Sequence, residues 1–363
     1  MSCPFLFITI LVTSQEPKSD SSCTSFPVLN RINLIASLNM SQFSQIFPPC
    51  PKFTDKDIPD QIGKVFIVTG GTSGVGFEVS RILYEKNATV YIAARSEAKI
   101  HKSIREIKQR YPSSQGKLEA LIIDLANLDT VQPAVEIFIS REQRLDVLFN
   151  NAGVMGTKPD EKSAQGYELQ MGTNTLGPFL FTGLLEPILL NTASHQSSSG
   201  DVRIVWVSSM LDVGTPKGGI VWDTHTDSPS VHSTMMANYM QSKAGITFLS
   251  HEFANKLGGN GIISTSLHPG MMKTELQRNM PTPVSAMMGV MFKGPTYGAF
   301  TELYAGFSSE IQSEQNGCYI IPWGRIGSVP QHMAPGMLSE EEGGTGLSKK
   351  FWGWCEATTS SYL

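Results

Sequence analysis

The glycine-rich stretch after the first clear strand pattern constrains the fold of this chain more than any other feature. Five strand-forming residues, Val65–Thr69, lead into a turn with glycines at positions 70, 74 and 76, and an amphipathic helical pattern then begins. Strand, glycine turn and helix in this order are the context that a dinucleotide-binding site requires. Glycine permits positive φ angles and lets the backbone approach a pyrophosphate, which binds against the N-terminus of the helix. An ordinary tight turn is the alternative, and the remaining motifs decide between the two.

Strand and helix patterns alternate along most of the chain after this turn. Six further strands are predicted at residues 89–93, 118–123, 145–149, 204–207, 262–267 and 318–321. The helices predicted between them include 166–190, 237–257 and one around 297–307. This alternation is typical of right-handed crossovers and a mostly parallel sheet. We therefore predict a single-domain α/β protein with a Rossmann-type, doubly wound sheet of about seven strands.

Composition and charge exclude several other classes of protein. A net charge of −4 gives no electrostatic footprint for nucleic acid or for an anionic membrane. Five cysteines without a CxxC pair indicate reduced thiols in a cytoplasmic protein, and we assign no metal ligands.

The first 60 residues differ from the rest by their clusters of Ser, Pro and Thr. The apolar run Phe5–Val12 is far shorter than the roughly 20 residues that span a bilayer. No Lys or Arg precedes it and no clear small-residue cleavage site follows, so a signal peptide is disfavoured. We predict a leader over 1–60 that is either disordered or the product of a mis-assigned start, with Met40 as an alternative first residue.

Three motifs place polar groups directly after predicted strands. Asn150-Asn151-Ala152-Gly153 closes the fourth strand, Ser208 and Ser209 end the fifth, and the His268–Thr274 segment follows the sixth. In open parallel sheets ligands bind beyond the carboxyl ends of the strands. Each of these sequences is also a common turn or helix entry, so none decides the matter alone.

The spacing of Tyr239 and Lys243 is the most specific chemical signal. Residues four apart lie on one face of a helix. A phenol with a pKa near 10 is a poor acid or base at neutral pH. We expect the neighbouring ammonium to favour the phenolate and to lower the pKa of Tyr239, so that the proton can be transferred. The same spacing also occurs by chance in many helices.

Taken in order, these motifs resemble the short-chain dehydrogenase/reductase family over roughly residues 60–325. The motifs are Thr69-Gly70-x-x-x-Gly74-x-Gly76, Asn150-Asn151-Ala152-Gly153, Ser209, Tyr239-x-x-x-Lys243 and Pro269-Gly270-x-x-x-Thr274. The segments at 174–179 and 267–276 are similar to its retinol-dehydrogenase-like branch, and 319–325 and 350–356 to fungal members. The resemblance implies a dehydrogenase domain at 61–325 and a C-terminal extension at 326–363.

The resemblance also implies a role for each site residue. Tyr239 would be the general acid/base, Lys243 would tune it and bind the nicotinamide ribose, and Asn174 would hold a water in a proton relay. Ser209, rather than Ser208, would hydrogen-bond the substrate oxygen. The residues expected to bind the cofactor, besides Tyr239 and Lys243, are Gly70, Ser73, Gly74, Val75, Gly76, Arg95, Asp124, Asn151, Met272 and Thr274.

The end of the second strand predicts the choice of cofactor. NAD-specific sites place a carboxylate there for the ribose hydroxyls. Here the strand ends in Ala94-Arg95-Ser96, without an acid at the critical turn. The guanidinium of Arg95 suits a phosphate, so we predict NADP(H). If Arg95 only stacks on the adenine, either cofactor would be usable.

The substrate side is less well defined by the sequence. The excursion at 211–236 and the methionines at 280, 287, 288 and 291 indicate a substrate region with a lid, although these methionines could equally fill a core. We expect an oxidoreductase for a small, apolar carbonyl or alcohol, and the resemblance to fungal members suggests a secondary-metabolite intermediate. The resemblance leaves open whether the protein forms a homo-oligomer. The alternative is a catalytically idle NADP(H)-binding sensor or scaffold.

Overall fold

The computed structural model describes residues 40–196, 200–210, 214–273 and 292–362. Its contacts divide the chain into two units, residues 1–50 and 51–363. The first unit contains the helix α2, Met40–Ile46. Residues 1–39 of the predicted leader lie outside the described residues. The predicted domain boundaries at 60 and 325 stay predictions.

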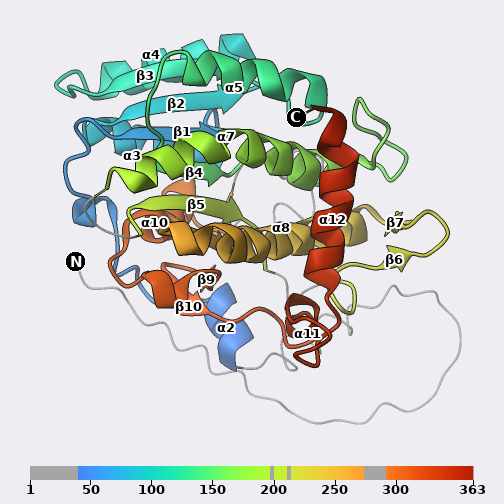
Figure 1. The fold of residues 1–363 in the computed structure, drawn as a ribbon. Coiled ribbons are helices and arrows are strands. Elements are labelled where there is room, and N and C mark those ends of the chain that lie inside the picture. Colours follow the sequence, from blue (N-terminus) through green and yellow to red (C-terminus); the bar gives the residue numbers. More distant parts are fainter. Residues whose placement is uncertain (1–39, 197–199, 211–213, 274–291, 363) are drawn as a thin grey trace, which may run out of the picture. The chain divides into compact units, whose positions relative to one another are not determined.

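The second unit is built on one sheet of eight strands in the order β10-β9-β8-β5-β4-β1-β2-β3 (Figure 1). The strands are β1 Val65–Thr69, β2 Thr89–Ala94, β3 Lys117–Ile122, β4 Val147–Asn150, β5 Val202–Val207, β8 Ile262–Leu267, β9 Tyr319–Ile321 and β10 Arg325–Gly327. Neighbouring strands are parallel, except that β10 pairs with β9 in the antiparallel sense. The predicted doubly wound, mostly parallel sheet is therefore confirmed. The antiparallel β10 was not predicted, because Arg-Ile-Gly is not fully buried and has no apolar run, unlike the buried Tyr-Ile-Ile of β9.

Helices cover both faces of this sheet (Figure 1). The main ones are α3 Gly74–Glu85, α4 Glu97–Arg110, α5 Val131–Ile139, α7 Gly177–Ser194, α8 Met235–Leu257 and α10 Pro295–Phe307. Because side chains alternate along a strand, each strand feeds two cores. Trp206 packs in the core under α5, α7 and α8, and Val205 packs in the core under α3, α4 and α10.

The C-terminal residues contribute to the core on the α8 side. After α11, Ala334–Met337, the helix α12, Leu347–Thr359, runs across α7 and α8 (Figure 1). Its Phe351 is fully buried, and a Cβ atom on Gly245 of α8 would lie 2.9 Å from that ring. Only glycine at position 245 therefore lets the two helices approach this closely.

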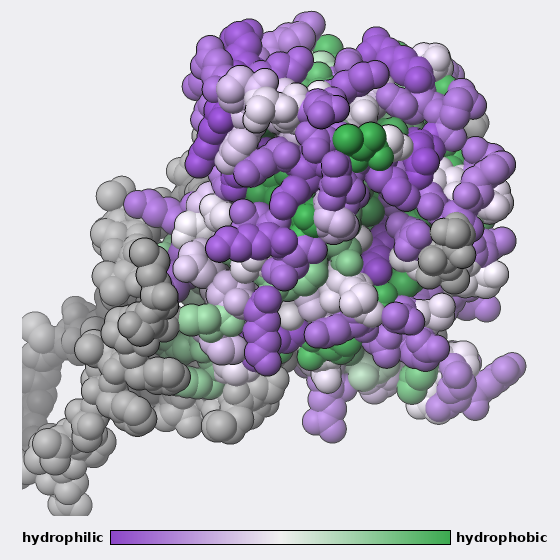
Figure 2. Space-filling view, turned by 90° about the vertical axis from the view of Figure 1, so that its left-hand side faces the viewer, coloured by the Kyte–Doolittle hydropathy of each residue, from purple (hydrophilic) through white to green (hydrophobic). Residues whose placement is uncertain are grey.

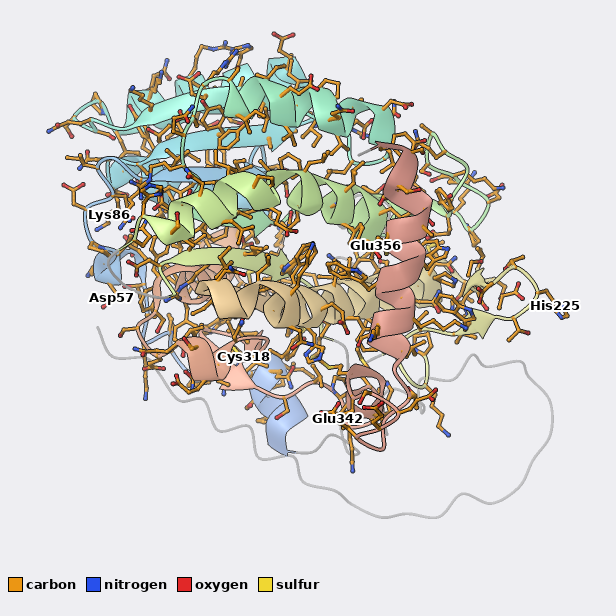
Figure 3. The ribbon with its side chains drawn as sticks, in the orientation of Figure 1. Asp57, Lys86, His225, Cys318, Glu342 and Glu356 are labelled. Atoms are coloured by element: carbon orange, nitrogen blue, oxygen red, sulfur yellow. The ribbon has the colours of Figure 1, made fainter. Side chains whose placement is uncertain are left out.

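The excursion predicted at 211–236 contains a short antiparallel hairpin. Its strands are β6, Trp222–Asp223, and β7, Ser228–Pro229. Figure 3 shows His225 at the tip of this hairpin, pointing away from the sheet. Met210, just before the excursion, and Met236, its last residue, line the cleft that is described below.

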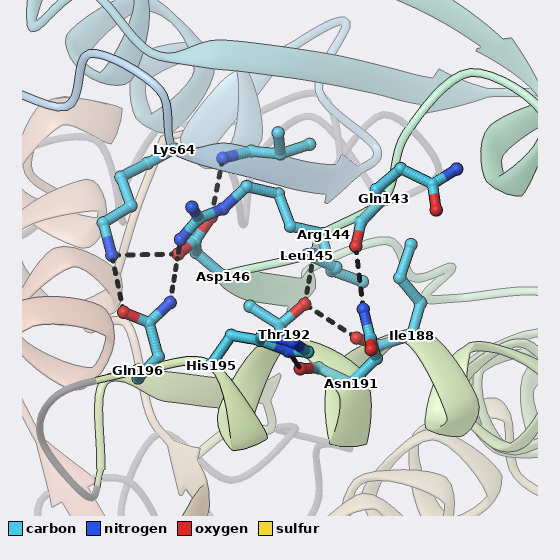
Figure 4. A network of polar contacts seen from close by, with 11 residues as sticks. Lys64, Gln143, Arg144, Leu145, Asp146, Ile188, Asn191, Thr192, His195 and Gln196 are labelled. Atoms are coloured by element: carbon cyan, nitrogen blue, oxygen red, sulfur yellow. Dashed lines mark hydrogen bonds and ion pairs between the residues drawn. The ribbon is translucent and has the colours of Figure 1, made fainter.

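A polar network fixes the amino ends of β1 and β4 (Figure 4). The buried carboxylate of Asp146 accepts hydrogen bonds from the backbone N–H of Val65 at 2.8 Å and from the guanidinium of Arg144 at 2.8 and 2.5 Å. Lys64 pairs with the same carboxylate at 3.1 Å. The charge of Asp146 is therefore compensated, and the two strands are held in register at the edge away from the glycine turn.

One stretch, Leu169–Ser194, is long and apolar enough to pass for a membrane-spanning helix. Packing accounts for its composition, because 61% of its most apolar part is buried and Phe181 and Leu185 lie in the core. Figure 2 shows the side that lies to the left in Figure 1. Hydrophilic residues cover most of the described surface there, and hydrophobic residues form small, separate patches.

Candidate active site

The glycine turn adopts a backbone that only glycine readily accepts. Gly70 and Gly74 have φ angles of 69° and 58°, in the left-handed region. A Cβ atom on Gly76 would lie 2.3 Å from Nδ2 of Asn151 and 2.8 Å from the carbonyl oxygen of Gly70. Ser73 is the N-cap residue of α3, and its side chain makes no capping hydrogen bond. The turn therefore presents the N-terminus of α3 with its first backbone N–H groups available to an anion.

Thr69 joins the turn to the Asn-Asn-Ala-Gly motif. Its hydroxyl donates to the carbonyl of Phe149 at 3.1 Å and accepts from the N–H groups of Asn151 and Ala152, both at 3.0 Å. The side chain of Asn151 in turn donates to the Thr69 carbonyl at 2.7 Å. The carboxyl ends of β1 and β4 therefore form one rigid floor at the point where the strand order reverses, which is where ligands bind in open α/β sheets.

A cleft of about 850 Å³ opens above this floor. The predicted site residues that line it are Gly70, Ser73, Gly74, Val75, Arg95, Asp124, Asn151, Ser208, Ser209, Tyr239, Lys243 and Met272. Gly76 and Asn174 do not line the cleft, and Thr274 lies outside the described residues, as do the methionines at 280–291.

Tyr239 and Lys243 project from α8 into the cleft. The Tyr239 hydroxyl shares a hydrogen bond with the side chain of Ser209, and only 5% of Tyr239 is exposed. Nζ of Lys243 lies 5.7 Å from the centroid of the Tyr239 ring and donates to the carbonyl of Val207 at 2.8 Å. The helix therefore brings the predicted phenol, ammonium and serine hydroxyl together.

The acidity of Tyr239 differs from the expectation. Burial raises the pKa of Tyr239 to about 12, although the hydrogen bond with Ser209 lowers it. Burial also lowers the pKa of Lys243 to about 7. The expected lowering of the phenol pKa is therefore wrong for this state of the protein. Removal of the phenol from water outweighs the ammonium, which is itself poorly solvated and directed at a backbone carbonyl.

The two serines at the end of β5 have different surroundings. Ser208 is 3% exposed; its hydroxyl donates to the carbonyl of Lys243 at 2.8 Å and accepts from Thr247 at 3.1 Å. Ser208 thus fastens α8 to β5, whereas the hydroxyl of Ser209 faces Tyr239. The hydroxyl of Tyr319 donates to the carbonyl of Ser209 at 2.5 Å and holds that residue in place.

Asn174 lies in a π-helical turn, Gly172–Leu176, between the short helix α6, Leu169–Met171, and α7. The long helix predicted over 166–190 is observed as one helical stretch, Leu169–Ser194, and the π-turn within it was not predicted. Oδ1 of Asn174 accepts from the N–H of Val154 at 2.8 Å, and Nδ2 donates to the Val154 carbonyl at 3.0 Å and to Ser242 at 2.9 Å. π-Turns occur frequently at functional sites, and this one places a fully buried amide against the loop after β4 and against α8.

Sequence reasoning assigned no role to several residues that the structure places in the cleft. Lys99 lines it near Arg95, one turn into α4. His268 is 3% exposed, accepts from the N–H of Gly270 at 3.3 Å, and is kept neutral because burial lowers its pKa to about 3. Five further methionines also line the cleft: Met155, Met210, Met236, Met240 and Met271. Their scattered sequence positions gave no signal. Over the described part of the chain, no cluster of His, Cys, Asp and Glu side chains could hold a metal ion.

Comparisons with known proteins identify what this architecture is similar to. Residues 64–284 match the family model for short chain dehydrogenase. A short-chain dehydrogenase/reductase from Phomopsis amygdali is 44% identical over 329 residues, which cover 88% of this chain and 97% of that protein. Another from Neocamarosporium betae is 40% identical, with coverage of 89% and 94%. Among solved structures, an uncharacterized protein from Mycobacterium Paratuberculosis has a TM-score of 0.60 at 24% identity and covers 85% of this chain and 97% of its own.

Proposed function

The chain belongs to the short chain dehydrogenase family, and from that premise we propose that it is an NADP(H)-dependent oxidoreductase for a small, apolar carbonyl or alcohol. Membership makes it an oxidoreductase of a family that binds NAD(P)(H). The single observation that carries the finer proposal is the hydrogen bond between Ser209 and Tyr239, inside the cleft that begins at the glycine turn. That pair is suited to polarise a substrate oxygen and to exchange a proton with it.

The shape of the cleft supports the proposal that it binds a dinucleotide cofactor. Glycines keep the floor open: a Cβ atom on Gly153 would lie 3.3 Å from Nζ of Lys243, and one on Gly76 would meet Asn151. We assign the pyrophosphate to the N-terminus of α3 and the adenosine side to Asp124 and Asn151. Lys243 would bind the nicotinamide ribose, with Met272 and Thr274 beside the carboxamide.

The proposed reaction divides the work between cofactor and protein. The nicotinamide, when bound, supplies hydride to the substrate carbon or accepts it. In reduction, the hydroxyls of Ser209 and Tyr239 donate hydrogen bonds to the carbonyl oxygen, and Tyr239 then delivers its proton to that oxygen. Lys243 as an ammonium stabilises the phenolate that remains, and Asn174 would support the relay that restores the proton. Oxidation of an alcohol reverses these steps.

The methionines support an apolar substrate. Methionine is flexible and polarisable, so a wall built from it adapts to varied apolar shapes. Five such methionines line the cleft together with Met272, and two of them, Met210 and Met236, flank the 211–236 excursion. We propose that the substrate is an apolar metabolite of secondary metabolism, handled in the cytoplasm.

A substrate panel tests this function. We expect apolar ketones and aldehydes to oxidise NADPH, measured as loss of absorbance by the reduced nicotinamide, faster than polyol-derived ketones of similar size. Binding of NADPH without turnover of any carbonyl compound or alcohol would favour the idle sensor instead. All four residues of the predicted tetrad are present, so nothing in the site favours that alternative.

Cofactor preference is the first specific prediction. Arg95, Ser96 and Lys99 line the cleft at the end of β2, whereas Glu97 is 65% exposed at its side chain and pairs with His101 at 3.5 Å. A charge-assisted contact to the 2′-phosphate contributes about 1.5–3 kcal/mol, or about a tenfold to hundredfold preference for NADPH. We expect Arg95→Ala to remove most of this preference, measured as the ratio of kcat/KM for the two cofactors.

Arg105 provides the matched control for this prediction. It lies on the same helix, is exposed and does not line the cleft. Arg105→Ala should therefore leave the ratio unchanged. Equal kcat/KM values for NADPH and NADH in the wild-type enzyme would contradict the assignment of Arg95.

A further inference from the structure

Asn238 and Gln241 are two buried polar side chains of α8 that the proposed reaction does not use. They are 2% and 1% exposed. Because an α-helix turns by about 100° per residue, they lie on the face of α8 opposite to the one that lines the cleft. That other face carries Met236, Tyr239, Met240 and Lys243. Within the described residues, the hydrogen-bond partners of both side chains belong to the 211–236 excursion.

Gln241 binds the base of the hairpin formed by β6 and β7. Its Oε1 accepts from the backbone N–H of Val221 and from Nε2 of His232, both at 2.9 Å, and its Nε2 donates to the carbonyl of Ser230 at 2.8 Å. The orientation of the amide is unambiguous, because a backbone N–H can only donate and a backbone carbonyl can only accept. Val221 directly precedes β6 and Ser230 directly follows β7, so one side chain holds both strands where they leave the hairpin.

Asn238 fixes the path by which the excursion returns to α8. Its Oδ1 accepts from the backbone N–H of His232 at 2.7 Å, and its Nδ2 donates to the carbonyl of the same residue at 3.0 Å. Two residues later Thr234 caps the helix, and its hydroxyl accepts from the N–H of Ala237 at 3.3 Å. The excursion therefore reaches its last residue, Met236, along a chain path that is held at every step.

Apolar packing contributes little to the position of the excursion. Only three of its described residues, which are 214–236, are buried: Gly219, Ile220 and Pro229. A cavity of about 180 Å³ is lined by residues 228–231, by Tyr167 and Trp354, and by the two amides of α8, so the hairpin is incompletely packed there. The position of the hairpin therefore depends on its hydrogen bonds to Asn238 and Gln241.

We propose that Asn238 and Gln241 are specificity-determining positioning residues: from the far side of α8 they hold the excursion, and with it Met236, as a fixed wall at the substrate end of the cleft. The proposal deepens the proposed function and rests on it for the identity of the substrate as a small, apolar carbonyl or alcohol. A fixed wall discriminates between apolar substrates of different shape, whereas a mobile wall accepts more shapes and binds the preferred one less tightly.

A chain-length series tests the proposal with the full-length enzyme. We compare the wild type with Gln241→Leu, which keeps the approximate volume and removes the hydrogen bonds, on methyl ketones of increasing chain length with NADPH. We expect kcat/KM for the preferred ketone to fall about tenfold, mainly through a higher KM, and the other ketones to change less, so that the profile becomes flatter. General destabilisation would instead lower kcat equally for all ketones. A uniform loss in kcat or an unchanged profile would overturn the proposal.

Two variants serve as matched controls. Lys350 of α12 contacts the exposed end of the hairpin, with Nζ at 4.4 Å from the ring centroid of Trp222 and 3.4 Å from Asp227. Exposed contacts of this kind contribute little, so Lys350→Met should keep the profile. Asn316 donates to the carbonyl of Ala254 at the other end of α8 at 3.0 Å. Asn316→Ala should lower stability and keep the profile. A flatter profile in either control would overturn the assignment of Gln241.

Hydrogen–deuterium exchange provides a readout that does not require turnover. In Gln241→Leu the N–H of Val221 loses its acceptor, so peptides that cover residues 221–232 should exchange about tenfold faster, while those from α10 keep the wild-type rate. Wild-type exchange over 221–232 would show that other contacts hold the excursion and would overturn the proposal. If Gln241→Leu does not fold, Asn238→Ala takes its place with the same expected changes. Faster exchange in a protein whose wild type converts no carbonyl or alcohol would instead contradict the proposed function.

Discussion

Replacing Tyr239 with phenylalanine is expected to reduce turnover by about 10²–10⁴-fold, while NADPH still binds. The substitution removes only the hydroxyl that bonds to Ser209 and leaves the buried ring in place. Steady-state kinetics with the best substrate of the panel measure the loss, and NADPH titration followed by tryptophan fluorescence measures binding.

Tyr167 offers a control for this substitution. Its ring packs edge-on against Trp354 at 5.9 Å, and it does not line the cleft. Tyr167→Phe should keep wild-type turnover. Near-wild-type activity in Tyr239→Phe would refute the general acid/base role.

Replacing Arg203 with methionine is expected to lower the free energy of unfolding by about 3–5 kcal/mol. Arg203 is 7% exposed and donates to the carbonyl oxygens of Gly200, Ala305, Ser308 and Ile311 at 2.9–3.1 Å. Burial lowers its pKa to about 10, so the guanidinium is charged at neutral pH. Methionine fills a similar volume but leaves the four carbonyl oxygens without this donor. Those of Ala305, Ser308 and Ile311 lie at or just after the C-terminal end of α10. Urea titration followed by circular dichroism gives the free energy.

The control for Arg203 is an arginine on the surface. The side chain of Arg141 is 52% exposed and lies 4.0 Å from a Glu119 carboxyl oxygen. Exposed pairs of this kind contribute at most about 1 kcal/mol, so Arg141→Met should have little effect. An equally small loss in Arg203→Met would show that the backbone carbonyls around α10 find other partners.

The parts of the fold that the sequence predicted are those with strong local signals. The strand predicted at 262–267 has the observed bounds, because a short run rich in β-branched residues is delimited by Gly261 and Pro269. Ser96 is the N-cap of α4, the role typical of a serine that follows a strand and precedes an amphipathic helix, and its hydroxyl accepts from the N–H of Lys99 at 3.4 Å. The site residues come together because parallel strands deliver their carboxyl ends to one edge.

Other features depend on tertiary contacts and could not be predicted from one sequence. The π-turn at 172–176 is stabilised by Asn174 bonding to a loop 20 residues earlier. Glu302 of α10 is fully buried, although glutamate is usually exposed, and no local pattern in the sequence signals this burial. The raised pKa of Tyr239 depends on how deeply α8 is buried.

The contact between Gly245 and Phe351 has a consequence for how selectivity diverges among relatives. Gly245 lies two residues after Lys243. A Cβ atom at position 245 would also lie 3.0 Å from the side chain of Thr175 in the π-turn. The helix that carries Tyr239 and Lys243 is therefore packed on one side by α12, while the 211–236 excursion is hydrogen-bonded to its Asn238 and Gln241. We expect excursions grafted from related enzymes to change which molecules are accepted, and to preserve turnover only where the bonds to Asn238 and Gln241 are kept. Selectivity and chemistry would then diverge together, through the first turns of one helix.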